Sequence, residues 1–295
     1  IRLVADRADV LTSGTLDASG QGAAGGTIQV LGDRVGLTGS AVVDVSGDTD
    51  GGSVQIGGGF QGSDPNVKNA EATFVGAGTK IDASAADIGD GGNVVVWADG
   101  ITRFNGEMVA RGGAVQGDGG SVEVSGKETL LYRGQVDARA VNGEIGTLLL
   151  DPLTIEIHGG ADAGPDENDL DFDFDAGPDD AEFTISEESL EETNAAINLE
   201  ARQSITTTAR DTFIYTAAVG DTDNEADGTD DEGVGVVQLQ PNVTLTMRTR
   251  NSSDPDEDPD TDNPDGAGLI DIDGVDDLEA ALVLTFRTQG QNITL

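Results

Sequence analysis

Residues 42–56 contain the runs Val42-Val-Asp-Val-Ser-Gly47 and Gly51-Gly-Ser-Val-Gln-Ile56, separated by three residues. The first run alternates apolar and polar residues, which is the period of a β-strand with one buried face. Glycines follow, and a residue without a Cβ atom suits a corner where neighbouring backbones crowd together. The second run alternates in the same way. The stretch therefore predicts two short strands joined by a tight glycine corner.

The same pattern recurs along the first half of the chain. Glycine pairs begin at residues 25, 51, 91 and 119, so their spacings are 26, 40 and 28 residues. The long interval contains Gly62-Ser-Asp-Pro-Asn66, which predicts a loop insertion. A third apolar run, such as Thr129–Tyr132, completes each copy. The copies are Thr15–Gly20 with Gly25–Val30, Val42–Gly47 with Gly51–Ile56, Lys80–Ser84 with Gly91–Val96, Met108–Gly112 with Gly119–Val124, and the degenerate pair Gln135–Arg139 with Ile145–Leu150.

Three strands per repeat, closed by glycine corners, predict an all-β fold: a three-sided parallel β-helix. Parallel crossovers are overwhelmingly right-handed, so we expect a right-handed β-helix. An antiparallel sandwich also has alternating strands and glycine turns, and it remains the alternative. The recurring period favours the solenoid.

The composition agrees with a repetitive scaffold. Aromatic residues make up 4% of the chain, there are 43 glycines and no cysteine, and the net charge is −41. A core with so few aromatics must be built from small aliphatic side chains. The negative charge argues against binding to nucleic acid or to anionic lipid, and it attracts divalent cations. No apolar run is long enough to insert into a membrane as a helix.

The two halves of the chain differ. Residues 1–150 have a net charge of −9, and residues 151–295 have a net charge of −32. We predict regular glycine-rich β-helix repeats over residues 1–157. We predict that residues 158–295 continue the β-helix with long acidic loops at about 160–181, 220–233 and 252–266. Ser186–Glu192 predicts one short helix, with Ser186 as its N-cap.

Several motifs resemble the repeat region of filamentous-haemagglutinin-like exoproteins of the two-partner secretion class, found in Gram-negative bacteria. The motifs are Val30–Ser40, Gly89–Asp99, Ala110–Gly113, Gly117–Lys127 and Gly146–Pro152. The resemblance covers residues 14–157 and thins afterwards. It implies a right-handed β-helix that is exported through an outer-membrane partner pore. It further implies that the protein acts as an adhesin, a toxin stalk or a surface filament.

The acidic loops hold the candidate metal ligands. Calcium takes about six to eight oxygen ligands around a turn, and alternating aspartates followed by glycine could supply them. Residue 234 is a valine where an EF-hand beginning at Asp223 would need a bidentate glutamate. The alternative is a solvated acidic loop that attracts cations only diffusely. The candidate calcium ligands are Asp223, Glu225, Asp227 and Asp230 in one loop, and Asp258, Asp260, Asp262 and Asp265 in the next.

Other residues could suggest chemistry. Asp17, Asp44, Asp82 and Asp137 recur at one position of the repeat, which favours an outward structural ladder over a catalytic pair. The single histidine, His158, precedes two glycines and is interpreted as a loop residue. Trp97 is either a large buried packing residue or an outward platform for a sugar. We therefore expect no enzymatic activity and no organic cofactor.

The function expected from these features is that of a rigid β-helical shaft or filament subunit outside the cell, at the bacterial surface. One alternative is an adhesin module whose loops bind a carbohydrate or protein receptor. The other is a carbohydrate-active β-helix enzyme. For a shaft, the expected partners are a second copy of the chain, joined end to end, or further turns of a longer chain. Both ends of the sequence are strand-like, and such ends expose edges that pair with other strands.

Overall fold

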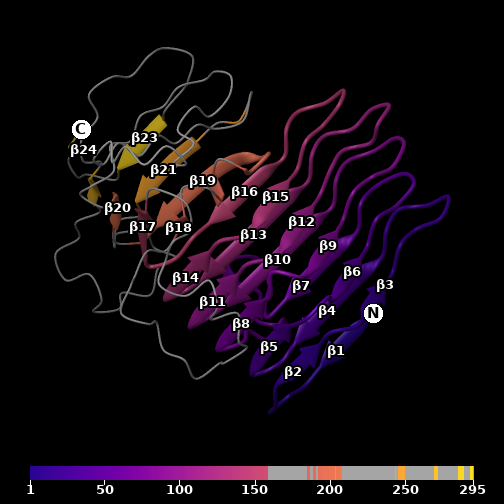
Figure 1. Ribbon diagram of the computed structural model, residues 1–295, viewed down its shortest axis with the longest axis horizontal. Coiled ribbons are helices and arrows are strands. Elements are labelled where there is room, and N and C mark those ends of the chain that lie inside the picture. The colour runs from indigo at the N-terminus through magenta and orange to yellow at the C-terminus, as the bar shows by residue number, and fades with distance from the viewer. Residues whose placement is uncertain are drawn as a thin grey trace, which may run out of the picture.

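The computed structural model describes residues 1–158, 185–186, 189–190, 192–202, 204–207, 243, 245–249, 269–271, 285–288 and 293–294. Nearly all ordered elements in these residues are β-strands, and every pair of neighbouring strands is parallel. The strands stack in columns while the chain winds from one sheet to the next (Figure 1). The fold is the predicted three-sided parallel β-helix.

Three sheets form the sides of the solenoid. Sheet A contains, in spatial order, β1 (Arg2–Val4), β4 (Thr27–Leu31), β7 (Ser53–Ile56), β10 (Asn93–Ala98), β13 (Ser121–Gly126), β16 (Thr147–Leu150), β19 (Ala196–Ala201), β21 (Leu245–Thr249) and β23 (Thr285–Thr288). Sheet B contains β2 (Val10–Thr12), β5 (Arg34–Leu37), β8 (Ala72–Val75), β11 (Ile101–Phe104), β14 (Thr129–Tyr132), β18 (Ile185–Ser186), β17 (Thr154–His158), β20 (Ser204–Thr207), β22 (Leu269–Asp271) and β24 (Ile293–Thr294). Sheet C contains β3 (Thr15–Asp17), β6 (Val42–Asp44), β9 (Lys80–Asp82), β12 (Glu107–Val109) and β15 (Gln135–Asp137).

The core consists of rows of aliphatic side chains, one from each turn of the solenoid. The register aligns equivalent residues of β4, β7, β10, β13 and β16. Alternate residues of these strands point inward and are completely or almost completely buried. One such row is Ile28, Val54, Val94, Val122 and Leu148. Each buried aliphatic side chain stabilises the fold by roughly 1.5–3 kcal/mol. The predicted inward-outward alternation is confirmed.

A few polar and aromatic groups lie inside the solenoid. The Thr73 hydroxyl donates a hydrogen bond to the carbonyl of Trp97 at 2.7 Å, and the Thr102 hydroxyl donates to the carbonyl of Ser125 at 2.8 Å. These bonds satisfy groups that would otherwise cost free energy to bury. The ring of Tyr132 stacks on the ring of Phe104, with centroids 5.5 Å apart.

Glycines hold successive turns close together at the corner between sheets C and A. A Cβ atom added to Gly119 would lie 1.8 Å from the carbonyl oxygen of Ala138 and 2.3 Å from the amide nitrogen of Gly146. The amide of Gly119 donates to the carbonyl of Glu144 at 2.9 Å. The backbone of the following turn therefore occupies the space that a side chain would need.

The insertion between β7 and β8 covers residues 57–71, as the 40-residue interval predicts. It contains a 3-10 turn, η1 (Phe60–Gly62). Among the described residues, Gln61 is the one non-glycine residue with a positive φ, at 51°. The side chain of Lys68 bonds to the backbone carbonyl of Asp6 and to Asp33, which ties the insertion to the first two turns of the solenoid.

Sheet B contains a strand that the repeat pattern does not predict. The short strand β18 lies between β14 and β17, with Ile185 paired to both Tyr132 and Ile157. The chain between β16 and β19 thus contributes two strands to sheet B. Ser186 ends β18, and it lies where the predicted N-cap of the following helical residues is expected, because an N-cap residue has an extended backbone. The Ser186 hydroxyl does accept the amide of Ser189 at 3.1 Å, and the backbone is helical at residues 189 and 190.

No helix in the described part of the chain is both long and apolar enough to cross a membrane.

Candidate functional site

The recurring aspartates form a ladder on the outer face of sheet C. The register places Asp17 beside Asp44, and Asp44 beside Asp82. Their neighbours on the strands point into the core, where Val43 and Ile81 are fully buried. The expectation of an outward structural ladder is therefore confirmed in its geometry.

Each aspartate of this ladder supports the loop that follows it. Asp17 accepts the Ser19 amide at 2.9 Å, Asp44 accepts the Ser46 amide at 2.9 Å, and Asp82 accepts the Ser84 amide at 3.1 Å. An aspartate that bonds to the amide two residues later closes a tight turn. The bond from the Ser19 amide, aided by the Ser19 hydroxyl, lowers the pKa of Asp17. These carboxylates hold the backbone of the C-to-A corner in place.

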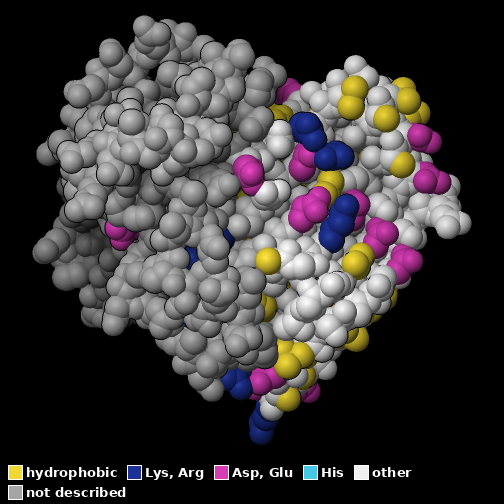
Figure 2. Space-filling model, viewed as in Figure 1, with side chains coloured by type: hydrophobic (Ala, Val, Ile, Leu, Met, Phe, Trp, Pro, Cys, Tyr) yellow, Lys and Arg dark blue, Asp and Glu magenta, His cyan; other side chains and the backbone are white. Residues whose placement is uncertain are grey.

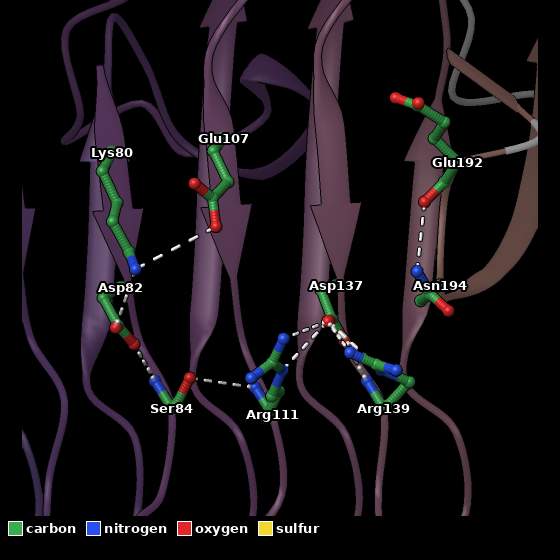
Figure 3. A network of polar contacts seen from close by, with 9 residues as sticks. All are labelled: Lys80, Asp82, Ser84, Glu107, Arg111, Asp137, Arg139, Glu192 and Asn194. Carbon is green, nitrogen blue, oxygen red and sulfur yellow. Dashed lines mark hydrogen bonds and ion pairs between the residues drawn. The ribbon is translucent and has the colours of Figure 1, made fainter. Parts of the chain in front are cut away.

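The ladder is interrupted at β12. Val109 occupies the position of the aspartate in that turn, and Arg111 occupies the position of the serine. Arg111 reaches along the solenoid to Asp137, with its Nε 2.9 Å from the Asp137 Oδ2. Arg139 contacts the same carboxylate, with its Nη2 2.6 Å from Oδ2 (Figure 3). Burial of Asp137 disfavours its charged form, but the hydrogen bonds from Arg139 and Arg111 outweigh this effect and lower its pKa.

The cations on this face are paired with carboxylates. Lys80 lies 4.0 Å from the carboxylates of both Asp82 and Glu107 (Figure 3). Of the nine residues drawn in Figure 3, three are cationic and four are anionic. Each of the three cations contacts a carboxylate. We infer that the outer face of sheet C links neighbouring turns and offers no cluster of uncompensated positive charge.

A second acidic ladder, which was not recognised in the sequence, lies in the loops between sheets C and A. The Oδ1 of Asp50 accepts the amide of Asp90 at 3.2 Å, and the Oδ1 of Asp90 accepts the amide of Asp118 at 2.8 Å. The Oδ1 of Asp118 accepts the amide of Glu144 at 2.8 Å. The signal was the acidic residue directly before three of the Gly-Gly pairs. Within the described residues, no group of three or more acidic, histidine or cysteine side chains is arranged to hold a metal ion.

Trp97 points outward from β10 and is covered by the insertion. Its side chain is 4% exposed, and the Cβ position of Gly62 would lie 2.6 Å from its ring. Its indole N–H donates to Asp99 at 3.0 Å, and the Asn69 amide donates to the same Asp99 oxygen at 3.0 Å. Trp97 is thus a buried packing residue beneath the insertion, outside the solenoid core, and it offers no face on which a sugar could stack.

The insertion also buries a carboxylate of sheet A. Glu123 is 1% exposed, and both of its carboxylate oxygens accept the amide of Gln61, at 2.9 and 3.1 Å. The side-chain amide of Gln61 donates to Asp151 at 3.2 Å. The left-handed conformation of Gln61 aims its amide at Glu123, and a strained backbone of this kind persists only where its surroundings hold it. This contact joins the insertion to two later turns.

The remaining candidates are the predicted calcium ligands, the acidic loops and His158. The eight predicted calcium ligands, Asp223, Glu225, Asp227, Asp230, Asp258, Asp260, Asp262 and Asp265, lie outside the described residues, so calcium binding stays a prediction. The acidic loops at about 160–181, 220–233 and 252–266 also lie outside them. The interpretation of His158 as a loop residue is wrong, because its backbone ends strand β17 and pairs with Ser186.

No protein-family model and no curated protein sequence matches this chain.

Proposed function

We propose that this chain is a rigid structural element, a β-helical shaft or filament subunit at the surface of a Gram-negative bacterium. The observation that carries the proposal is the register of sheet A, in which equivalent residues of successive turns pair in parallel without interruption from β4 to β16. The interior row of buried aliphatic side chains has no break there. A solenoid of this kind resists bending, because each turn is bonded to the next along three sides.

The location and the export route rest on the resemblance of the glycine-rich repeats to filamentous-haemagglutinin-like exoproteins. A secreted protein of that class leaves the cell through an outer-membrane partner pore. A high net negative charge keeps such a rod soluble and discourages side-by-side aggregation. The lack of cysteine in the sequence suits a scaffold whose stability comes from a continuous core.

We further propose that the first turn of the solenoid stacks on another turn, supplied either by a second copy joined end to end or by further turns of a longer chain. The outermost strands β1, β2 and β3 each have a strand neighbour on one side. Leu3, Val10 and Leu16 pack against the core from this first turn and are only partly buried. Another turn of the same kind would cover these side chains and pair with the open backbone edge.

The test uses Leu3→Lys, which places a charge at the uncovered end of the core. The matched control is Leu11→Lys, because Leu11 is 53% exposed on the outside of β2. Sedimentation velocity over a range of protein concentrations should show longer species for the unaltered chain and for Leu11→Lys. Leu3→Lys should remain a single subunit. A single subunit at every concentration for the unaltered chain would exclude end-to-end joining.

A further inference from the structure

An exposed apolar ridge runs along the tips of three successive loops between sheets C and A. Its residues are Ile88, Val115 and Val141, with exposed fractions of 56%, 62% and 71%. Figure 2 shows hydrophobic side chains at the loop tips that project at the upper right, with acidic side chains beside them. Exposure of aliphatic side chains to water is energetically unfavourable, and a row of such side chains on a surface marks an interaction site.

The ridge is held by bonds between the loops. The amide of Val115 donates to the carbonyl of Asp87 at 2.8 Å, and Ile88 forms a parallel bridge with Gln116. The side-chain amide of Asn142 donates to the carbonyl of Val115 at 3.1 Å. A partner would therefore meet a preformed surface, and little conformational entropy would be lost on binding.

The ridge has a line of negative charge beside it. Asp90, Asp118 and Glu144 follow the three apolar residues by two or three positions in the same loops, and all three are exposed. Their backbone amides and two of their carboxylates form the inter-turn bonds described above. No lysine or arginine occurs in residues 86–92, 112–120 or 140–146. A partner must therefore bring positive charge next to an apolar strip.

The spacing of the ridge selects the type of partner. Successive turns of the solenoid are about 4.8 Å apart, which is the spacing between neighbouring strands. An α-helix that lies along the solenoid axis repeats about every 5.4 Å. Over the two intervals between the three ridge residues, the helix repeat and the solenoid repeat therefore differ by about 1.2 Å in total. Same-face residues of an extended strand are about 6.7 Å apart, and the mismatch is then about 4 Å.

We propose that the ridge formed by Ile88, Val115 and Val141, with its flanking acidic residues, binds an amphipathic α-helix of another protein. The helix lies along the solenoid axis. Its apolar residues, one per turn, pack on the ridge, and lysine or arginine side chains on one flank pair with Asp90, Asp118 and Glu144. This interaction is independent of the role of the chain as a shaft.

The test measures binding of a fluorescein-labelled, 18-residue synthetic peptide to the full chain by fluorescence anisotropy. The peptide has leucine at every third or fourth position, lysine on one flank of the leucines, and alanine elsewhere. Val115→Ser should weaken binding about fivefold to tenfold, because one aliphatic contact is lost. Asp118→Asn keeps an acceptor for the Glu144 amide and should weaken binding by about twofold to fivefold, with a smaller dependence on salt.

Two controls separate the ridge from general attraction. Phe60→Ser removes another half-exposed apolar side chain, on η1, and should leave binding unchanged. A peptide of the same composition in scrambled order should bind at least about tenfold more weakly. The proposal is overturned if the ordered peptide does not bind, if Val115→Ser binds it as well as the unaltered chain does, or if the scrambled peptide binds equally. Tighter binding of a strand-forming peptide with alternating valine and lysine would also overturn it.

Discussion

Gly119→Ala is expected to destabilise the β-helix strongly, because the added methyl group has no space. Its Cβ atom would lie 1.8 Å from the Ala138 carbonyl oxygen, and ordinary contact distances begin at 3.4 Å. The two turns would have to separate by about 1.5 Å, roughly the difference between these distances. That movement breaks or weakens the 2.9 Å bond from the Gly119 amide to the Glu144 carbonyl and the 3.0 Å bond from the Thr147 amide to the Gly120 carbonyl, which join the two turns.

Each lost backbone bond costs about 1 kcal/mol, and the remaining backbone distortion adds a similar or larger amount. Alanine also restricts the unfolded chain, which offsets about 0.4–1 kcal/mol. The free energy of unfolding should therefore fall by about 2–4 kcal/mol.

The matched control is Gly14→Ala, because no atom lies within 4 Å of the Cβ position at Gly14. This change should alter the free energy of unfolding by less than about 1 kcal/mol, in the stabilising direction. Urea denaturation, followed by circular dichroism and by the fluorescence of Trp97, gives both values. Equal urea midpoints for the two variants would refute the close stacking of turns at this corner.

Three further predictions concern single side chains. Trp97 is the one tryptophan of the chain and is 4% exposed, so its emission should be blue-shifted and resistant to acrylamide quenching; solvent-like emission from the folded chain would contradict its burial beneath the insertion. Asp137 has a lowered pKa, so its contribution to stability is present above the unfolded value of about 3.9 and is lost as pH falls through the folded value. Asp137→Asn should therefore cost about 1–2 kcal/mol at pH 7 and much less at pH 2, measured by urea denaturation; an equal cost at both pH values would argue against the ion pairs. Burial raises the pKa of Tyr132 despite its hydroxyl contact with Thr193, so stability should fall as pH rises above about 10; Tyr132→Phe should reduce that loss in thermal melts, and an unchanged loss would contradict the assignment.

Much of the fold could be predicted from the sequence because one local pattern repeats. The predicted strand Thr129–Tyr132 is β14, and the strand before Gly47 is β6, with Val43 inward and Asp44 outward. Period-two alternation determines which side chains are buried, and the Gly-Gly pairs show where the turns touch. Neither property depends on long-range information.

The place of β18 within sheet B could not be predicted in the same way. Its two residues lie between β14 and β17, and their position depends on how the chain returns to sheet B after β17. No repeat spacing encodes that return. Ser186 could be predicted as an N-cap because that signal is local: its hydroxyl accepts the amide three residues later.

The candidate sites were predicted less well. The burial of Trp97 could not be predicted from its own strand, because the residues that cover it come from the preceding turn, 28 or more positions earlier in the chain. The acidic ladder of Asp50, Asp90 and Asp118 was visible as a repeated Asp-Gly-Gly motif. Its use as an acceptor for the next turn becomes clear only when the turns are stacked.

Electron microscopy of the purified chain tests the proposed role as a rigid shaft most directly. We predict straight, unbranched rods of constant width that lengthen by end-to-end joining as the protein concentration rises, with a repeat of about 4.8 Å along the axis. Compact, rounded particles at every concentration, or rods that bend freely between turns, would contradict it.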